Sequence, residues 1–224
     1  LLRQTGSALC FGCHTAMKDS LATGVVHAPV KNGECATCHD GHQTQDAEGR
    51  VALATPCVQC HDPGSSALRQ KHSEFKVADS SCTSCHDPHR SDKKGLLRPN
   101  RHEPFAGGSC DTCHKPAAPG EKPELVAEQA ELCGTCHGEV ATAKPPRGVH
   151  APVEAGECTS CHNPHATRGA KLLPENRSRL CGECHADLVQ TATAGDRERI
   201  HAPVLAGACQ SCHGGHEGVM PGLL

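Results

Sequence analysis

The 224-residue chain lacks tryptophan and tyrosine and contains only three phenylalanines. Hydrophobic residues make up 36% of the chain, and its mean hydropathy is -0.47. Large apolar side chains normally fill a protein core, so an ordinary single-core enzyme of this length is disfavoured. Something other than aliphatic and aromatic packing must organise this fold.

Blocks of like charge and long apolar runs are also missing from the sequence. The 22 Lys and Arg and 25 Asp and Glu residues are scattered in both signs, for a formal charge of -3. This distribution disfavours a nucleic-acid partner. No apolar run is long enough to span a bilayer, and the residues that follow Leu1 lack the pattern of an export signal. We therefore expect no transmembrane segment in this chain.

Cysteine, in contrast, is abundant and regularly spaced. All 18 cysteines fall into nine CxxC pairs, numbered here as motifs 1 to 9: Cys10/Cys13, Cys35/Cys38, Cys57/Cys60, Cys82/Cys85, Cys110/Cys113, Cys133/Cys136, Cys158/Cys161, Cys181/Cys184 and Cys209/Cys212. Each pair is followed at once by a histidine, which we call the proximal histidine of its motif. These are His14, His39, His61, His86, His114, His137, His162, His185 and His213.

The CxxCH spacing is typical of covalent c-type haem attachment. Two thiols add across the two vinyl groups of one haem, and the adjacent histidine binds the iron as an axial ligand. Zinc sites made from CxxC pairs would use two pairs each, leave one pair over and leave the histidines unexplained. A disulfide scaffold would not need CxxC at every position. The sequence therefore predicts nine haem c groups, with their iron.

Nine further histidines match the number of second axial ligands that nine haems need. They are His27, His42, His72, His89, His102, His150, His165, His201 and His216. Three 16-residue segments align without gaps, with nine identical positions: HAPVKNGECATCHDGH, HAPVEAGECTSCHNPH and HAPVLAGACQSCHGGH. Each has a histidine eight residues before the first cysteine and another three residues after the proximal histidine.

The upstream histidines precede motifs 2, 4, 5, 7 and 9, and we expect each to bind the haem of the motif that it precedes. They are His27, His72, His102, His150 and His201, of which only His72 has a spacing of ten residues. The downstream histidines lie too close to their own proximal histidine to reach the far face of the same haem. We expect His42, His89, His165 and His216 to bind the haems of His14, His61, His137 and His185, respectively.

This assignment predicts a repeat of arrangement 2+2+1+2+2. Residues 1–100 would hold haems 1 to 4, residues 101–124 the single haem 5 and a linker, and residues 125–224 haems 6 to 9. The three parts would form one continuous extended unit.

The pattern resembles the doubled-CxxCH multihaem cytochromes c, from Cys10 to His216. That group includes periplasmic electron carriers, cytochromes threaded through outer-membrane porins and extracellular cytochrome filaments. The upstream histidine at eight residues is also similar to that of small tetrahaem cytochromes, where it binds the haem of the motif that it precedes. Motif 5 departs from strict doubling, because Lys115 and Pro116 follow His114.

Local sequence predicts a mostly irregular fold with short α-helices, wrapped around a stacked haem array, with little or no β-sheet. Helix-compatible sequence, rich in Ala, Leu, Glu and Gln, covers Thr5–Leu21, Glu124–Ala143 and Asn176–Ala194. No segment has the alternating pattern of a strand. Nine haems would also add 18 propionates, so we expect cations such as Arg98, Arg101 and Arg179 to include propionate partners.

Two function classes follow from this reading. In the first, nine bis-histidine haems transfer electrons, either in an extracellular or outer-surface wire or in a periplasmic carrier. In the second, a multihaem redox enzyme of the nitrite or hydroxylamine type keeps one iron open. The ligand count leaves no iron open and no CxxCK motif occurs, so we expect no enzyme.

Export to the periplasm or the cell exterior is expected, because c-type haem is attached after export. Partners would be redox proteins, an extracellular acceptor or further copies in head-to-tail assembly.

Overall fold

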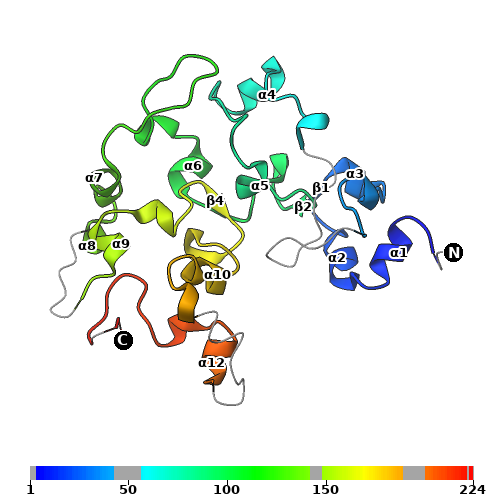
Figure 1. Ribbon diagram of the computed structural model, residues 1–224. Coiled ribbons are helices and arrows are strands. Elements are labelled where there is room, and N and C mark those ends of the chain that lie inside the picture. Colours follow the sequence, from blue (N-terminus) through cyan, green and yellow to red (C-terminus); the bar gives the residue numbers. More distant parts are fainter. Residues whose placement is uncertain (1–3, 43–56, 142–147, 189–199, 221, 224) are drawn as a thin grey trace. The chain divides into compact units, whose positions relative to one another are not determined.

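The computed structural model describes residues 4–42, 57–141, 148–188, 200–220 and 222–223. Short helices alternate with irregular segments throughout these residues (Figure 1). The α-helices are α1 (Ser7–Phe11), α2 (Thr15–Ser20), α3 (Ala28–Lys31), α4 (Ser66–Lys71), α5 (Cys82–Cys85), α6 (Glu103–Gly107), α7 (Gln129–Gly134), α8 (Gly138–Ala141), α9 (Ala151–Glu154), α10 (Arg177–Gly182) and α12 (Ala202–Leu205). The 3-10 helices are η1 (Cys35–Thr37), η2 (Cys57–Gln59), η3 (Lys94–Leu96), η4 (Cys110–Thr112), η5 (Cys158–Ser160), η6 (Ala170–Leu172) and η8 (Cys209–Ser211).

The predicted fold class is confirmed: the chain is mostly irregular, with short helices and little sheet. Each predicted helical range is broken at its CxxCH motif. The range that begins at Thr5, for example, divides into α1 and α2 because His14 between them has a non-helical backbone, with φ -92° and ψ 55°. The other two ranges contain α7, α8 and α10, and their last residues lie outside the described part.

Two small antiparallel sheets join segments that are far apart in the sequence. Strand β1 (Val25–Val26) pairs with β2 (Arg90–Ser91), and β3 (Asn100–Arg101) pairs with β4 (Ala166–Thr167). An isolated antiparallel bridge, outside these strands, joins Val149 to Glu217. Two-residue strands carry too little alternation to be read from sequence.

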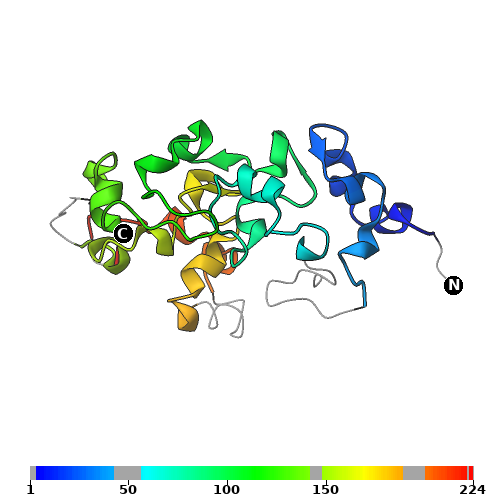
Figure 2. The same cartoon turned by 90° about the horizontal axis from the view of Figure 1, so that it is seen from above.

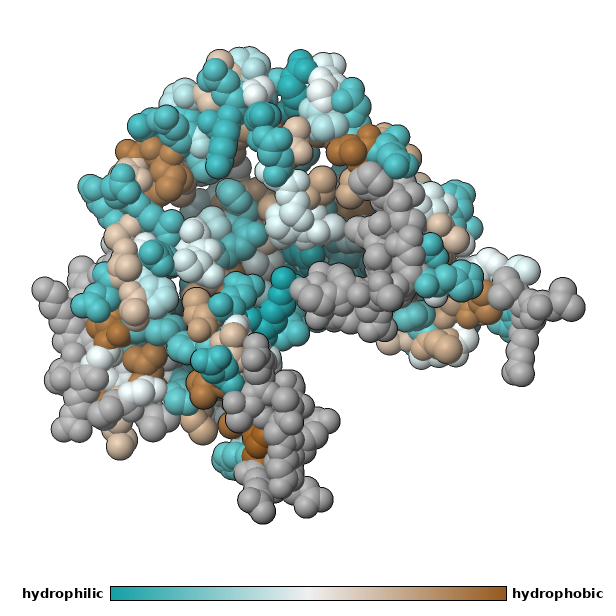
Figure 3. All heavy atoms as spheres, viewed as in Figure 1, coloured by the Kyte–Doolittle hydropathy of each residue, from teal (hydrophilic) through white to brown (hydrophobic). Residues whose placement is uncertain are grey.

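Side-chain burial is slight among the described residues. Ala166 and Leu173 are the buried hydrophobic residues there, Ser91 and Thr167 are the buried polar ones, and no large side chain is fully buried. On the face shown in Figure 3, hydrophobic side chains lie scattered among hydrophilic ones. Apolar packing between side chains therefore stabilises this fold little, as the composition predicts.

The chain divides into two units. The first contains residues 1–99 and 117–123, and the second contains residues 100–116 and 124–224. The short return segment is tied to the first unit by backbone hydrogen bonds, from Lys76 to Glu121 at 2.9 Å and from Gly120 to Glu74 at 2.8 Å. Motif 5 thus belongs to the second unit. Both units consist of short helices, loops and a small sheet, which Figure 2 shows from above.

Glycines six residues after an upstream histidine let two motifs approach each other closely. Gly156 has a positive φ of 73°, and a Cβ placed on it would lie 2.6 Å from the Cβ of Ala130 in α7. Gly33 lies in the same way against Ser7, and Gly207 against Ser178. Gly108 has a similar φ of 77° but nothing within 4 Å of such a Cβ. These contacts bring together motifs 1 and 2, 6 and 7, and 8 and 9.

We predict that Gly156→Ala destabilises the haem-loaded protein more than Gly108→Ala does. Both alanines would bear the strain of a left-handed backbone, about 1–2 kcal/mol. Only the alanine at 156 would also overlap Ala130, which adds about 1–3 kcal/mol. The midpoints of urea unfolding, followed by circular dichroism, compare the two. An equal decrease of the unfolding midpoint in both variants would show that Gly156 does not lie against Ala130.

Candidate haem sites

All nine CxxCH motifs share one backbone turn. In each, the amide of the proximal histidine donates a hydrogen bond to the carbonyl oxygen of the first cysteine, at 2.9–3.0 Å. Residues three and four apart lie on the same side of a helical turn. The turn therefore places both thiols and the histidine of a motif together. No disulfide joins any of the 18 cysteines, all of which lie in the described residues.

Exposure to solvent differs among the 18 cysteines that we expected to hold haem. Twelve are partly buried, and the six exposed ones are Cys13, Cys60, Cys82, Cys136, Cys184 and Cys212. A haem joined to Cys13, Cys136 or Cys212 would itself cover part of the thiol, so this exposure is compatible with attachment. A thioether bond is covalent, so an exposed cysteine can still hold the edge of a haem.

The exposed cysteines occupy one position of the motif almost without exception. Five of the six are the second cysteine of a CxxCH pair, and only Cys82 is a first cysteine. First cysteines are otherwise partly buried, as Cys10, Cys133 and Cys209 are. The second thiol of a motif is thus exposed more often than the first. The six exposed cysteines remain predicted attachment points, now at the outer side of their motifs.

Seven pairs of histidine rings lie at similar separations, and we say that the two histidines of such a pair face each other, whatever the angle between their rings. Ring centres lie 5.7–6.2 Å apart, and six of the seven pairs have interplanar angles of 15–25°. Each pair joins one proximal histidine to one of the nine other histidines. The pairs are His61/His27, His39/His89, His86/His72, His137/His102, His114/His165, His185/His150 and His162/His216.

The width of the gap fits an iron bound by both rings. A metal ion about 2 Å from one nitrogen of each imidazole would hold the ring centres about 6 Å apart. Direct packing of rings covers a similar range of distances, so the distance alone does not decide. The composition of the pairs does, because all seven combine a motif histidine with a non-motif one. The residues present therefore fit bis-histidine haem.

The predicted assignment of upstream and downstream ligands is wrong in most places. His27 faces His61 of motif 3 instead of His39 of motif 2, and His89 faces His39 instead of His61. His102 and His150 likewise face the motif after their own, at His137 and His185, while His165 and His216 face His114 and His162.

The physical reason lies in the backbone at the start of each HAPV segment. His27 is the N-cap of α3, with an extended φ of -60° and ψ of 136°, and its amide donates to the carbonyl of His89 at 3.0 Å. The small sheet of β1 and β2 ends at this pair of residues. The histidine is thereby directed toward the neighbouring segment, and the loop does not wrap around its own haem.

His72 is the exception, and it faces His86 of its own motif as predicted. Its ring nitrogen Nδ1 lies 2.9 Å from the carbonyl oxygen of Leu68, within α4. In the other pairs a downstream histidine faces the proximal histidine two motifs earlier, and motif 6 offers none to His86, because Val140 lies three residues after His137. The upstream histidine of motif 4 takes that place.

Four histidines make no such ring pair among the described residues: His14, His42, His201 and His213. The expected contacts of His42 with His14 and of His201 with His213 are therefore not made. The side chain of His42 is fully exposed. Seven of the nine predicted irons would thus have two histidine ligands within the described part of the chain.

Hydrogen bonds orient several of the proximal rings. The Nδ1 atoms of His86, His162 and His213 lie 2.6–2.8 Å from the carbonyl oxygens of Gly95, Lys171 and Gly222, each nine residues further along the chain. A carbonyl accepts only from a protonated nitrogen, so Nδ1 carries the proton and Nε2 is left for a metal.

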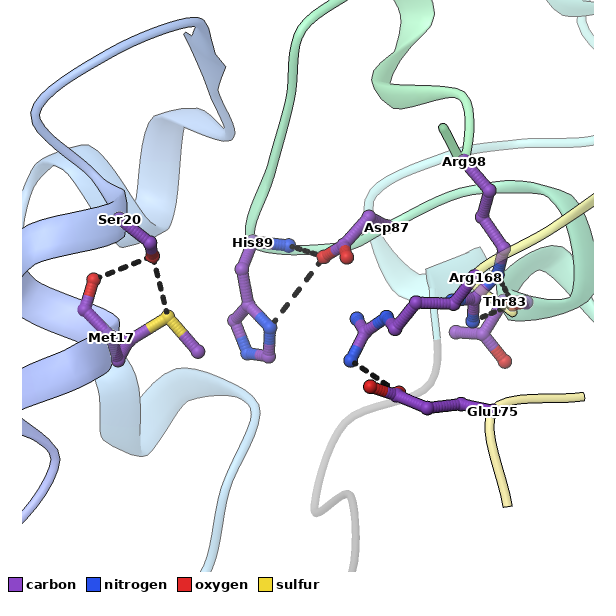
Figure 4. Close-up of polar contacts among 8 residues, drawn as sticks. All are labelled: Met17, Ser20, Thr83, Asp87, His89, Arg98, Arg168 and Glu175. Atoms are coloured by element: carbon purple, nitrogen blue, oxygen red, sulfur yellow. Dashed lines mark hydrogen bonds and ion pairs between the residues drawn. The ribbon is translucent and has the colours of Figure 1, made fainter. Parts of the chain in front are cut away.

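The downstream histidines sit in a shared turn. The amide of His89 donates to Oδ1 of Asp87 at 3.0 Å, and the Asp87 carboxylate also lies 3.7 Å from the ring nitrogen Nδ1 (Figure 4). His165 and His42 make the same backbone contact with Asn163 and Asp40, both at 2.9 Å. Burial lowers the pKa of His165, which favours the neutral imidazole that binds metals.

Thiols of neighbouring motifs lie beside each other. Burial, together with the charge and hydrogen bond of Cys158, raises the pKa of the Cys133 thiol to about 11. The same two causes, in the same order, raise the pKa values of Cys35 beside Cys10, Cys82 beside Cys57 and Cys181 beside Cys209. These contacts join the first cysteines of motifs 1 and 2, 3 and 4, 6 and 7, and 8 and 9.

Of the three arginines expected beside propionates, Arg101 fits best. Its Nε atom is buried and has no hydrogen-bond partner among the described residues. Arg98 instead donates from Nε to the carbonyl of Thr83 at 2.8 Å, and Arg179 lies 3.9 Å from the Glu183 carboxylate. A buried guanidinium nitrogen without a partner is costly, and a haem propionate would supply the acceptor.

A protein-family model described as the doubled CXXCH motif matches residues 27–66, 72–101, 102–142 and 150–190, more than half of the chain. The chain belongs to this family. As a doubled-CXXCH multihaem cytochrome c, it carries haem c covalently on its CxxCH motifs and has the family's general role in electron transfer. A search of curated proteins found no significant match. No helix in the described part of this cytochrome is long and apolar enough to cross a membrane.

The family matches also mark where each ring pair is made. Every matched range begins at an upstream histidine. Three of the four ranges contain the motif that this histidine precedes and also the following motif. Each range contains one complete ring pair, such as His27/His61 in the first and His150/His185 in the last. The family matches therefore follow the ring pairs, whereas the contacts between first cysteines join the motifs that the 2+2+1+2+2 grouping puts together.

We predict that His27→Gly opens the iron bound at Cys57 and Cys60. The double variant Cys57→Ala with Cys60→Ala lacks the haem that His27 would bind. Adding His27→Gly to this variant should therefore create no new high-spin haem. In the matched background Cys35→Ala with Cys38→Ala, it creates one equivalent. Electron paramagnetic resonance of the oxidised protein counts the high-spin haem. The opposite pattern would restore the assignment expected from spacing.

We also predict that Arg101→Gln lowers the midpoint potential of one haem by tens of millivolts. Removal of a positive charge beside a propionate favours the more positively charged ferric state. Arg179→Gln is the control, because Arg179 is half-exposed beside Glu183. Spectroelectrochemical titration measures both variants. A titration curve for Arg101→Gln that overlays the wild-type curve would remove Arg101 from the haem environment.

Proposed function

We propose that this cytochrome carries nine covalently bound haems and transfers electrons along them, without catalysing a reaction of its own. The observation that supports this most directly is the composition of the seven ring pairs. Each combines a proximal histidine with a non-motif histidine, which is the ligand set of a six-coordinate haem. Bound haem supplies an iron that exchanges one electron at a time.

The neighbouring thiols support electron transfer between motifs. Cys133 touches Cys158, and the charge of Cys113 also acts on Cys133. The charge of Cys184 acts on Cys161 in the same way. Since cysteines hold the edges of their haems, these contacts bring haems 5 to 8 of the second unit close together. Each transfer then crosses a short gap.

Saturated coordination suits a carrier of electrons. At the seven paired sites, two histidines per iron leave no site for a substrate, and rings such as those of His86 and His162 are oriented before the haem changes oxidation state. Little reorganisation of the protein is then needed. The alternative, a nitrite or hydroxylamine enzyme, would use an open iron. His14 and His213 are the motif histidines without a facing ring in the described residues, so such a reaction would occur there.

Export is part of the proposal. All 18 thiols are used as thioethers when nine haems are bound, and c-type haem is attached outside the cytoplasm. The cytochrome would act in the periplasm or at the cell exterior, where its partners are redox proteins or an extracellular acceptor. Within that setting it serves as a periplasmic carrier or as part of an outer-surface wire.

Mass spectrometry and redox titration of the purified protein test this function. We expect a mass that corresponds to nine haems, full reduction by dithionite and full reoxidation, and no turnover of nitrite or hydroxylamine. A smaller number of haems would contradict the nine-haem proposal. Steady turnover at either substrate would favour the enzyme.

A further inference from the structure

Three places in the structure join two segments in one way, which we call a junction. At each, the amide of an upstream histidine donates to the carbonyl of a downstream histidine. The three bonds are His27 to His89 at 3.0 Å, His102 to His165 at 3.0 Å and His150 to His216 at 2.8 Å. An antiparallel pairing flanks each bond, at Val26/Arg90, Arg101/Ala166 and Val149/Glu217.

Every junction also exchanges ligands between its two segments. We call the segment with the upstream histidine the donor side and the other the acceptor side. At the third junction, His150 of the donor side faces His185 of the acceptor side, and His216 of the acceptor side faces His162 of the donor side. The other two junctions follow the same rule.

The four histidines without a facing ring in the described residues have the same composition as the members of one more junction. His201 and His213 make up a donor side, with an upstream histidine and the proximal histidine of the next motif. His14 and His42 make up an acceptor side, with a proximal and a downstream histidine. The exchange rule would pair His201 with His14 and His42 with His213.

Both sides already have the local structure of the junctions that are formed. His201 caps α12 with φ -57° and ψ 129°, close to the -63° and 133° of His150. Among the described residues its amide has no hydrogen-bond acceptor, whereas the amide of His150 has one. His42 is held by Asp40 as His89 is held by Asp87. The ring of His213 is oriented by Gly222, as that of His162 is by Lys171.

We propose that the donor side of one copy and the acceptor side of a second copy form a fourth junction, so that copies assemble head to tail. This inference rests on the proposed function, because the shared ligands act on bound haem. One copy carries both complementary sides, and a contact between unlike surfaces leaves one of each free for further copies. Each contact would complete two irons, bound at His14 of one copy and at His213 of the other. Backbone pairing beside His201 would add to the contact.

The test uses the haem-loaded full chain and three variants. Wild type should form larger species as its concentration rises, seen by sedimentation velocity and electron microscopy, with almost no high-spin haem in the assembled fraction. His42→Gly with His201→Gly should remain a single copy with nine haems and two equivalents of high-spin haem. The single variant His201→Gly should assemble more weakly. His150→Gly, the matched control, should gain one high-spin equivalent and still assemble.

The outcomes separate this inference from the proposed function. A redox-active wild type with nine haems that remains a single copy at every soluble concentration would overturn the inference alone, whatever the spin state of its haems. Assembly that His42→Gly with His201→Gly leaves unchanged would overturn it as well. A haem count below nine, or haems that cannot be reduced, would instead contradict the proposed function.

Discussion

The structure depends on one contact, in which two imidazole rings about 6 Å apart face each other across the position of an iron. One ring belongs to a CxxCH motif and the other to a segment elsewhere in the chain. No large side chain is fully buried in the described residues, so few other contacts could hold these segments together. Seven such pairs would act as cross-links when haem iron is bound between their rings. We therefore regard haem as the main stabilising component of the fold.

The exchange of histidines at the junctions makes neighbouring segments depend on each other. His27 and His89 hydrogen bond through their backbones, and each ring completes a site on the other's segment. Loss of either histidine would weaken both a haem site and the small sheet beside it. The same arrangement brings consecutive motifs close together, as the contact of Cys133 with Cys158 illustrates. Stability and electron transfer thus have a common structural origin.

The sequence was sufficient to predict the class of protein, the short helices and the pairing of motifs 1 with 2 and 6 with 7 seen at Gly33 and Gly156. For most of the nine other histidines, it did not predict which proximal histidine each one faces. Spacing measures distance along the chain, whereas the direction of His27 is decided by an N-cap and a two-residue ladder with Arg90. Such a ladder has no sequence signature. Only His72, whose neighbour offers no competing histidine, follows the simple rule.

A structure of the haem-loaded chain by cryo-electron microscopy tests the central claim most directly. We predict that the iron attached at Cys57 and Cys60 lies between His61 and His27, and that the iron at Cys35 and Cys38 lies between His39 and His89. An iron coordinated by both His27 and His39 would contradict it, because each upstream histidine would then serve its own motif and the exchange between segments would not exist.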